Sequence, residues 1–227
     1  MEYQSVFTQD KKVKTRNDDE DEYLNMDFAD SIKMYNKPKT VNEVDAYIDQ
    51  RVHAPFYYRN LIQLLRMSEP EDTVRIWLNT KGGYMDSALQ IIDAMSASKA
   101  KVIVVMSGEV MSAGSMIALG APNVVVGEQA RMMIHCASYG VGGKSPDIVD
   151  RVNFETRELQ SIMNKIYEGF LSKEELKRVM EGKEMYFNAD EIIHRLEARA
   201  EYQKKLVEAQ QTAPKVSTKR AKKASLE

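Results

Sequence analysis

The sequence predicts an α/β protein built around a parallel β-sheet that helices flank. The alternation of two hydrophobic patterns leads to this fold class. Short, nearly continuous apolar runs such as Val102–Met106 alternate along the chain with longer segments whose apolar residues recur at helical spacing. Strands of a parallel sheet are buried on both faces, so an unbroken apolar run is typical of them.

The first two strand–helix pairs follow directly from this pattern. Residues 44–48 are a short strand candidate, and a helix over about 54–68 would place three leucines on one side. Residues 73–79 form a second strand that Gly82-Gly83 ends, and a helix follows near 85–97.

The next predicted elements flank Ser112 and His135. The apolar run 102–106 predicts a strand, and a helix rich in small residues follows it, starting near Ser112. Two further strands are predicted at 124–126 and 132–134, the second ending just before His135.

From about residue 147 the pattern becomes helical. One helix is predicted over about 147–170, and a second begins at Ser172, where Ser172-Lys173-Glu174-Glu175 is a capping-box pattern. A last, charged helix is predicted over about 189–210.

Composition restricts the class of protein. With 227 residues, 43% of them hydrophobic and 29% charged, the chain can form one substantial core. The net charge of −2 disfavours nucleic acid as a partner, and no apolar stretch approaches the roughly 20 residues of a membrane span. The single Cys136 excludes an internal disulfide and fits a cytoplasmic protein.

We expect residues 1–40 to be a polar, partly disordered arm and residues 211–227 a basic, disordered tail.

Ser112 and His135 are the candidate reactive pair. A serine hydroxyl is a poor nucleophile at neutral pH unless an imidazole lies within hydrogen-bond reach and N–H donors hold the oxyanion. Ser112 lies where a strand gives way to a helix, whose first N–H groups lack intrahelical acceptors. In an open α/β sheet, the carboxyl ends of neighbouring parallel strands lie at the same edge. We therefore expect Gly82-Gly83, Ser112 and His135 to converge there.

These motifs resemble those of the proteolytic subunit of the Clp protease, a family of self-compartmentalised serine peptidases. The resemblance covers roughly residues 42–191, and the segments that carry it are Asn79–Gly83, Gly108 to Gly114, Arg131–His135 and Glu184–Glu191. It implies a fold of repeated ββα units, as in the Clp protease and crotonase superfamily, with sheet layers flanked by helices and a long handle helix. Residues 41–191 would then be the peptidase domain, and residues 192–210 an added charged helix.

The resemblance also implies a role for individual residues. Ser112 would be the nucleophile, His135 the general base, and the backbone N–H groups of Gly83 and Ala113 the oxyanion hole. The motif that usually begins with the catalytic Asp begins here with Glu184, whose extra methylene moves the carboxylate by on the order of 1.5 Å. Either the backbone has retreated to compensate, or Asp190 is the third member instead.

Assembly and partners are implied in the same way. The family forms two stacked seven-membered rings around an enclosed chamber, joined by the handle helix, and a separate ATP-driven AAA+ unfoldase delivers protein or peptide substrates. Gly140, Gly142 and Gly143 match the family's substrate-aligning hairpin. No cofactor and no metal is expected. Two departures, Thr80-Lys81 in place of a Ser-Pro pair and the charged C-terminal helix, would fit a divergent, phage-encoded member.

The sequence also leaves alternative functions and an alternative nucleophile open. A crotonase-like acyl-CoA enzyme would share the paired N–H groups but does not require a Ser–His pair. A non-catalytic ring or assembly subunit is a further alternative, because of the Glu184 exchange and the altered C-terminus. Ser115 is a rival nucleophile one turn into the helix.

Overall fold

The computed structural model describes residues 41–212. The predicted arm at 1–40 and the predicted tail from residue 213 onward therefore lie outside the described residues. Helix α6 (Ala189–Thr212) continues to Thr212, slightly beyond the predicted end of the charged helix.

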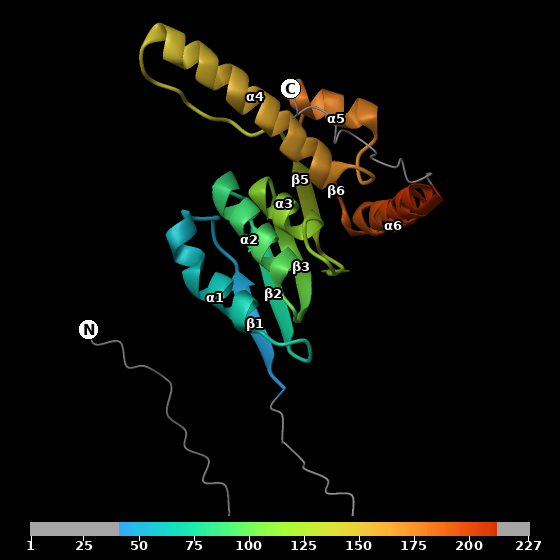
Figure 1. The fold of residues 1–227 in the computed structure, drawn as a ribbon. Helices are drawn as coiled ribbons and strands as arrows, with labels where there is room; N and C mark the ends of the chain where they lie inside the picture. The colour runs from blue at the N-terminus through green and yellow to red at the C-terminus, as the bar shows by residue number, and fades with distance from the viewer. Residues whose placement is uncertain (1–40, 213–227) are drawn as a thin grey trace, which may run out of the picture. The chain divides into compact units, whose positions relative to one another are not determined.

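Within the described residues, six strands form one sheet (Figure 1). Its strands are β1 (Glu43–Ile48), β2 (Thr73–Thr80), β3 (Lys101–Met111), β4 (Val124–Val126), β5 (Arg131–Ile134) and β6 (Met185–Phe187). The order is β1-β2-β3-β5-β6, with β4 also paired to β3, and only the β5–β6 pairing is antiparallel. The predicted α/β class with a mainly parallel sheet is confirmed. Strand β6 was not predicted, since its three residues are too short to show a period.

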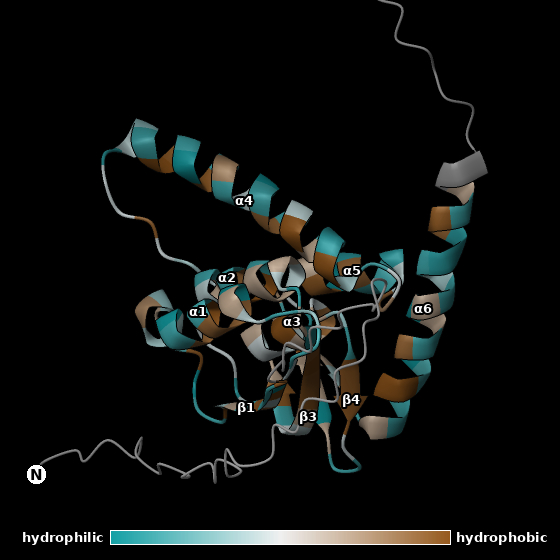
Figure 2. Cartoon of the chain, turned by 60° about the horizontal axis from the view of Figure 1, so that its bottom comes forward, coloured by the Kyte–Doolittle hydropathy of each residue, from teal (hydrophilic) through white to brown (hydrophobic). Residues whose placement is uncertain are grey.

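The helices are a 3-10 turn η1 (Pro55–Tyr58), α1 (Arg59–Met67), α2 (Met85–Ala97), α3 (Ala113–Leu119), α4 (Ser145–Tyr167), α5 (Lys173–Met180) and α6. Helices α1, α2 and α3 lie side by side against the sheet, and α6 contacts β4 and β5 (Figures 1 and 2). The N-terminal half of α4 extends away from the sheet in both views. The predicted helix at 54–68 is divided into η1 and α1, and that at 147–170 runs from 145 to 167.

Strand β3 is longer than the predicted 102–106 because it changes partners along its length. On the edge away from β2, residues 104–106 pair with β4 and residues 109–111 pair with β5. Between these two stretches the β2–β3 register shifts, and Asn79 Oδ1 accepts a hydrogen bond from the N–H of Glu109 at 3.0 Å. A Cβ on Gly108 would lie only 2.7 Å from that oxygen, so this irregularity requires glycine. The extension carries Ser112 to the end of β5.

Helix α6 is tied to the rest of the domain by a half-buried arginine. The Arg199 guanidinium donates to the carbonyl oxygens of Leu119 and Ile166 at 2.8 and 2.9 Å, near the C-terminal ends of α3 and α4. These carbonyls lack intrahelical donors, and a cation at a helix C-terminus also complements the helix dipole. Burial lowers the pKa of Arg199 from its usual value. One side chain thus holds three helices together.

The predicted capping box at the start of α5 is confirmed, and α6 completes it. Ser172 Oγ accepts from the Glu175 N–H, while the Glu175 carboxylate accepts from the Ser172 N–H. Arg195 of α6 donates to both oxygens of Glu175, at 3.0 and 2.7 Å, and its guanidinium lies 4.7 Å from the centre of the Phe187 ring. These hydrogen bonds, first of all those from Arg195, lower the pKa of Glu175 to about 2.

This pKa predicts an acid-sensitive contribution to stability. A carboxyl group whose pKa is lowered by folding stabilises the protein above its unfolded pKa of 4.5, and the contribution is lost as the pH falls toward about 2. We expect Glu175→Gln to lower the free energy of unfolding by about 1 kcal/mol at pH 7. In thermal unfolding followed by circular dichroism, the gap between wild type and variant should narrow from pH 6 to pH 3. A gap that stays constant over this range would contradict the ion-pair account.

Candidate active site

Ser112 occupies a strained turn between β3 and α3. Its φ of 55° and ψ of −120° make it the one residue other than glycine with positive φ among residues 41–212. Such a conformation costs on the order of 1–3 kcal/mol and persists only where its surroundings enforce it. Here the Ser112 N–H donates to Met133 O at 2.9 Å, and its carbonyl accepts from Ser115 Oγ at 2.7 Å. A sharp strand-to-helix turn of this kind exposes the serine hydroxyl.

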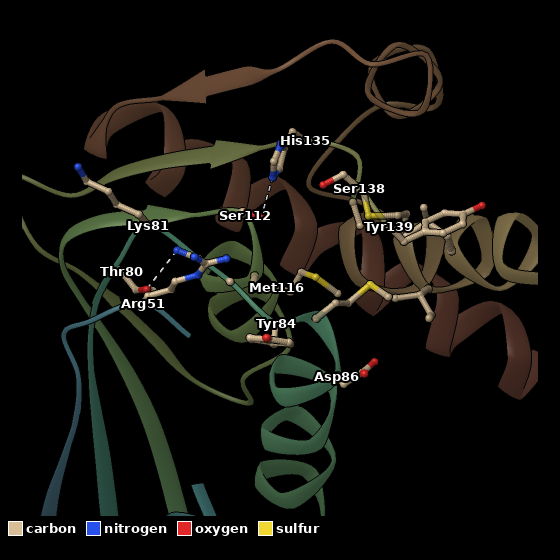
Figure 3. Close-up of a pocket in the computed structure, with 18 of the residues that line it drawn as sticks. Arg51, Thr80, Lys81, Tyr84, Asp86, Ser112, Met116, His135, Ser138 and Tyr139 are labelled. Atoms are coloured by element: carbon tan, nitrogen blue, oxygen red, sulfur yellow. Dashed lines mark hydrogen bonds between the residues drawn. The ribbon is translucent and has the colours of Figure 1, made fainter. Parts of the chain in front are cut away.

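The hydroxyl of this turn meets the imidazole that follows β5. His135 Nε2 lies 2.7 Å from Ser112 Oγ (Figure 3). The contact follows from the sheet, because the Ser112 N–H is bonded to Met133, two residues before His135. In the tautomer with its hydrogen on Nδ1, Nε2 accepts the serine proton. The structure thus brings together the two residues that the sequence singled out.

Gly82, the first of the two glycines before α2, lies against the same turn. A Cβ on Gly82, whose φ is 89°, would come within 2.7 Å of Ser112 Cβ and 3.0 Å of Ala113 N. The backbone of Gly82 is fixed by Val52 and by Thr80, since Val52 N–H donates to its carbonyl and its own N–H donates to Thr80 Oγ1. This close approach requires glycine and brings Gly83 to the cleft that Ser112 lines.

Ala113 is the first residue of α3, so its N–H is one of those without an intrahelical acceptor. Both Gly83 and Ala113 line the cleft next to Ser112 and His135. These are the two positions predicted for an oxyanion hole.

Glu184 reaches the imidazole from the neighbouring strand. The register of β5 and β6 pairs Ile134 with Met185, so Glu184, just before β6, comes opposite His135. One carboxylate oxygen, Oε1, lies 4.0 Å from His135 Nδ1, while Oε2 accepts a hydrogen bond from the Tyr186 hydroxyl at 2.6 Å. The carboxylate thus faces the imidazole at a distance longer than a hydrogen bond. The alternative acid, Asp190, is exposed in the first turn of α6.

Ser115, the rival nucleophile, is fully buried. Its hydroxyl donates to the Ser112 carbonyl, and its oxygen lies 2.8 Å from the hydroxyl of Tyr167, which is buried in α4. Because the Ser115 hydrogen is already donated, the phenol must be the donor of the second bond. Burial raises the pKa of Tyr167. This chain of hydroxyls joins α4 to the strained turn. It could not be predicted from the sequence, because no local pattern distinguishes Tyr167 from an ordinary core residue.

A cleft of about 1140 Å³ opens in front of the Ser112–His135 pair (Figure 3). Its inner wall is apolar and comes from α3 and α4, with Met116, Leu159 and Met163 among the lining residues. Charged side chains stand at its rim: Arg51, Lys81, Asp86, Glu155 and Glu158. Such a combination suits an extended chain whose apolar side chain enters a pocket.

The predicted substrate-aligning glycines lie beside this cleft in a loop. Residues 135–144 contain no strand, and a Cβ on Gly140, Gly142 or Gly143 would meet nothing within 4 Å. The hairpin suggested by the resemblance is therefore not formed in the single chain, since a glycine-rich segment without a neighbouring strand has few contacts to stabilise it. Gly140 and Val141 still line the cleft.

Two further features of the described residues bear on function. No three His, Cys, Asp or Glu side chains of residues 41–212 are grouped as a metal site would require. In the same part of the chain, no helix has both the length and the apolar composition needed to cross a bilayer.

A comparison with known protein families shows to which family the chain belongs. The family model of the Clp protease matches residues 31–195, which include the strained turn, the imidazole and Glu184. The chain belongs to the Clp protease family. This match confirms the resemblance seen in the sequence motifs and the predicted fold class. Clp proteases are serine peptidases, and members of the family generally form oligomeric rings.

The buried hydroxyl pair offers a test of how the serine turn is held. Ser115→Ala would leave the Tyr167 phenol buried without its acceptor and should destabilise the domain by about 1–3 kcal/mol. Tyr167→Phe should cost less, and the double variant should lose clearly less than the sum of the two. Urea unfolding of the four proteins measures this coupling. Strictly additive losses would show that the two hydroxyls do not interact.

Proposed function

We propose that this member of the Clp protease family is a catalytically active serine endopeptidase that cleaves peptide bonds through an acyl-enzyme on Ser112. The observation that supports the proposal most directly is the 2.7 Å contact between Ser112 Oγ and His135 Nε2 at a strained strand-to-helix turn. A serine peptidase of the Ser–His type needs this hydroxyl–imidazole contact, whereas a crotonase-like acyl-CoA enzyme does not.

The proposed reaction has two halves. Ser112 Oγ attacks the carbonyl carbon of the scissile bond, and its proton passes to His135 Nε2. The oxyanion is held by the N–H groups of Gly83 and Ala113, and its collapse expels the amine, which takes the proton from His135. A water molecule, deprotonated by His135, then attacks the ester and releases the carboxylic acid product while Ser112 regains its proton.

Glu184 would stabilise the imidazolium that forms on His135. The 4.0 Å separation is longer than a hydrogen bond, and catalytic contacts commonly shorten once substrate is bound. The same separation is the observation that favours the alternative function, a ring subunit without activity. The apolar wall of Met116, Leu159 and Met163 would receive the side chain before the scissile bond.

We further propose that the chain works as stacked seven-membered rings in the cytoplasm, supplied by an AAA+ unfoldase and without a cofactor. The family's ring architecture supports this, as do apolar side chains exposed on the extended half of α4: Val149, Val152 and Phe154. An enclosed chamber would restrict access to the cleft. Gly140, Gly142 and Gly143 would align substrate there by strand-like backbone pairing.

Covalent labelling tests the nucleophile. A fluorophosphonate probe should label wild-type protein, and Ser112→Ala should abolish both labelling and the cleavage of a fluorogenic peptide, a loss of several orders of magnitude. Ser115→Ala should still be labelled, on Ser112, which separates the two serines. Labelling that persists in Ser112→Ala would refute the assignment, and folded rings that are never labelled would favour the inactive subunit.

Electron microscopy tests the assembly. Negative-stain images of wild type should show seven-fold rings stacked in pairs. Phe154→Glu places a charge on the exposed apolar side of α4 and should yield single rings, because buried unpaired charge is costly at an interface. Particles that remain monomeric in wild type at micromolar concentration would contradict the ring proposal.

A further inference from the structure

Tyr186 is the one hydrogen-bond partner that the described structure gives to the Glu184 side chain. Its hydroxyl donates to Oε2 at 2.6 Å, whereas Oε1 faces His135 Nδ1 at 4.0 Å. The two oxygens of one carboxylate are thus divided between a phenol and an imidazole. A bond from a phenol to a carboxylate is short and stronger than one between neutral groups.

The backbone places Tyr186 where it can make this bond. Glu184 and Tyr186 are two residues apart on an extended segment, so their side chains project from the same face of the strand. Tyr186 is paired with Met133 on β5, two residues from the position opposite His135, which Glu184 occupies. The phenol and the carboxylate therefore lie next to each other along one edge of the sheet, with the carboxylate opposite the imidazole of His135.

The length of the Glu184 side chain explains why a second anchor matters. Glu has one more rotatable bond than Asp, and the Glu184 side chain is 50% exposed, so without a partner its carboxylate would sample many positions in solvent. The phenol itself makes little contact with the core, since Tyr186 is 63% exposed. Its hydroxyl is thus better explained by the bond to Glu184 than by packing.

We propose that Tyr186 is a positioning residue of the active site, which holds the Glu184 carboxylate beside His135 and so compensates for the use of Glu in place of a shorter acid. The inference rests on the proposed serine peptidase function. Tyr186 itself touches neither substrate nor the reacting atoms and acts through Glu184.

The experiment is a double-variant cycle on peptide cleavage. Tyr186→Phe removes only the hydroxyl and should lower kcat by about tenfold, the equivalent of one hydrogen bond, with KM unchanged. In a Glu184→Gln background the same change should have no further effect. Tyr202→Phe is the matched control: its exposed hydroxyl donates to Glu168 at 2.7 Å, away from the cleft, and its loss should leave kcat unaltered.

A second measurement does not depend on activity. The bond to Glu184 raises the pKa of Tyr186, so Glu184→Gln should lower the pKa of this phenol, followed by NMR with labelled tyrosine. An unchanged phenol titration in Glu184→Gln would overturn the inference even for an inactive chain.

The outcomes separate the two proposals. Wild type that resists the fluorophosphonate probe refutes the peptidase function. Wild type that is labelled and cleaves peptide, with Tyr186→Phe equally active or faster, overturns the role of Tyr186 alone. A loss of kcat that adds to that of Glu184→Gln would also overturn it, because Tyr186 would then act independently of the carboxylate.

Discussion

The strained backbone at Ser112 is the constraint on which the site depends. A positive φ at a residue with a side chain persists only when the neighbouring structure enforces it, and here β5 and α3 both do so. The bond from Ser112 N–H to Met133 O fixes the turn to the strand that ends at His135, and the bond from Ser115 Oγ fixes its carbonyl to α3. The short contact between hydroxyl and imidazole is a consequence of this arrangement.

Strand β3 makes that constraint possible by changing partners. Its first half pairs with β4, and its second half, after the irregularity filled by Asn79, pairs with β5. A regular strand that ended with the apolar run would leave the serine far short of the imidazole. Glu184 comes to lie opposite His135 because β6, a strand of three residues, pairs antiparallel with β5. Glu184, just before β6, and Tyr186 project from one face, and in the proposed peptidase the phenol would hold the longer acid beside His135.

Much of this could be predicted from the sequence, because the apolar runs and helical periods mark most elements and the motifs mark Ser112 and His135. The elements and contacts that the sequence does not predict are hidden from it for physical reasons. The second half of β3 contains Ser107, Gly108 and Glu109, which break the apolar pattern while the backbone continues. Strand β6 is too short to show a period. The contacts of Tyr167 with Ser115 and of Tyr186 with Glu184 depend on tertiary packing, which local spacing does not encode.

The proposed reactive centre combines the Ser112 hydroxyl, the His135 imidazole and two backbone N–H groups. A crystal structure of the protein treated with a peptide boronate tests it most directly. We expect a tetrahedral boron bonded to Ser112 Oγ, with one boron oxygen within hydrogen-bond distance of the N–H groups of Gly83 and Ala113. Boron bound to another side chain, or an oxygen turned away from both N–H groups, would contradict it.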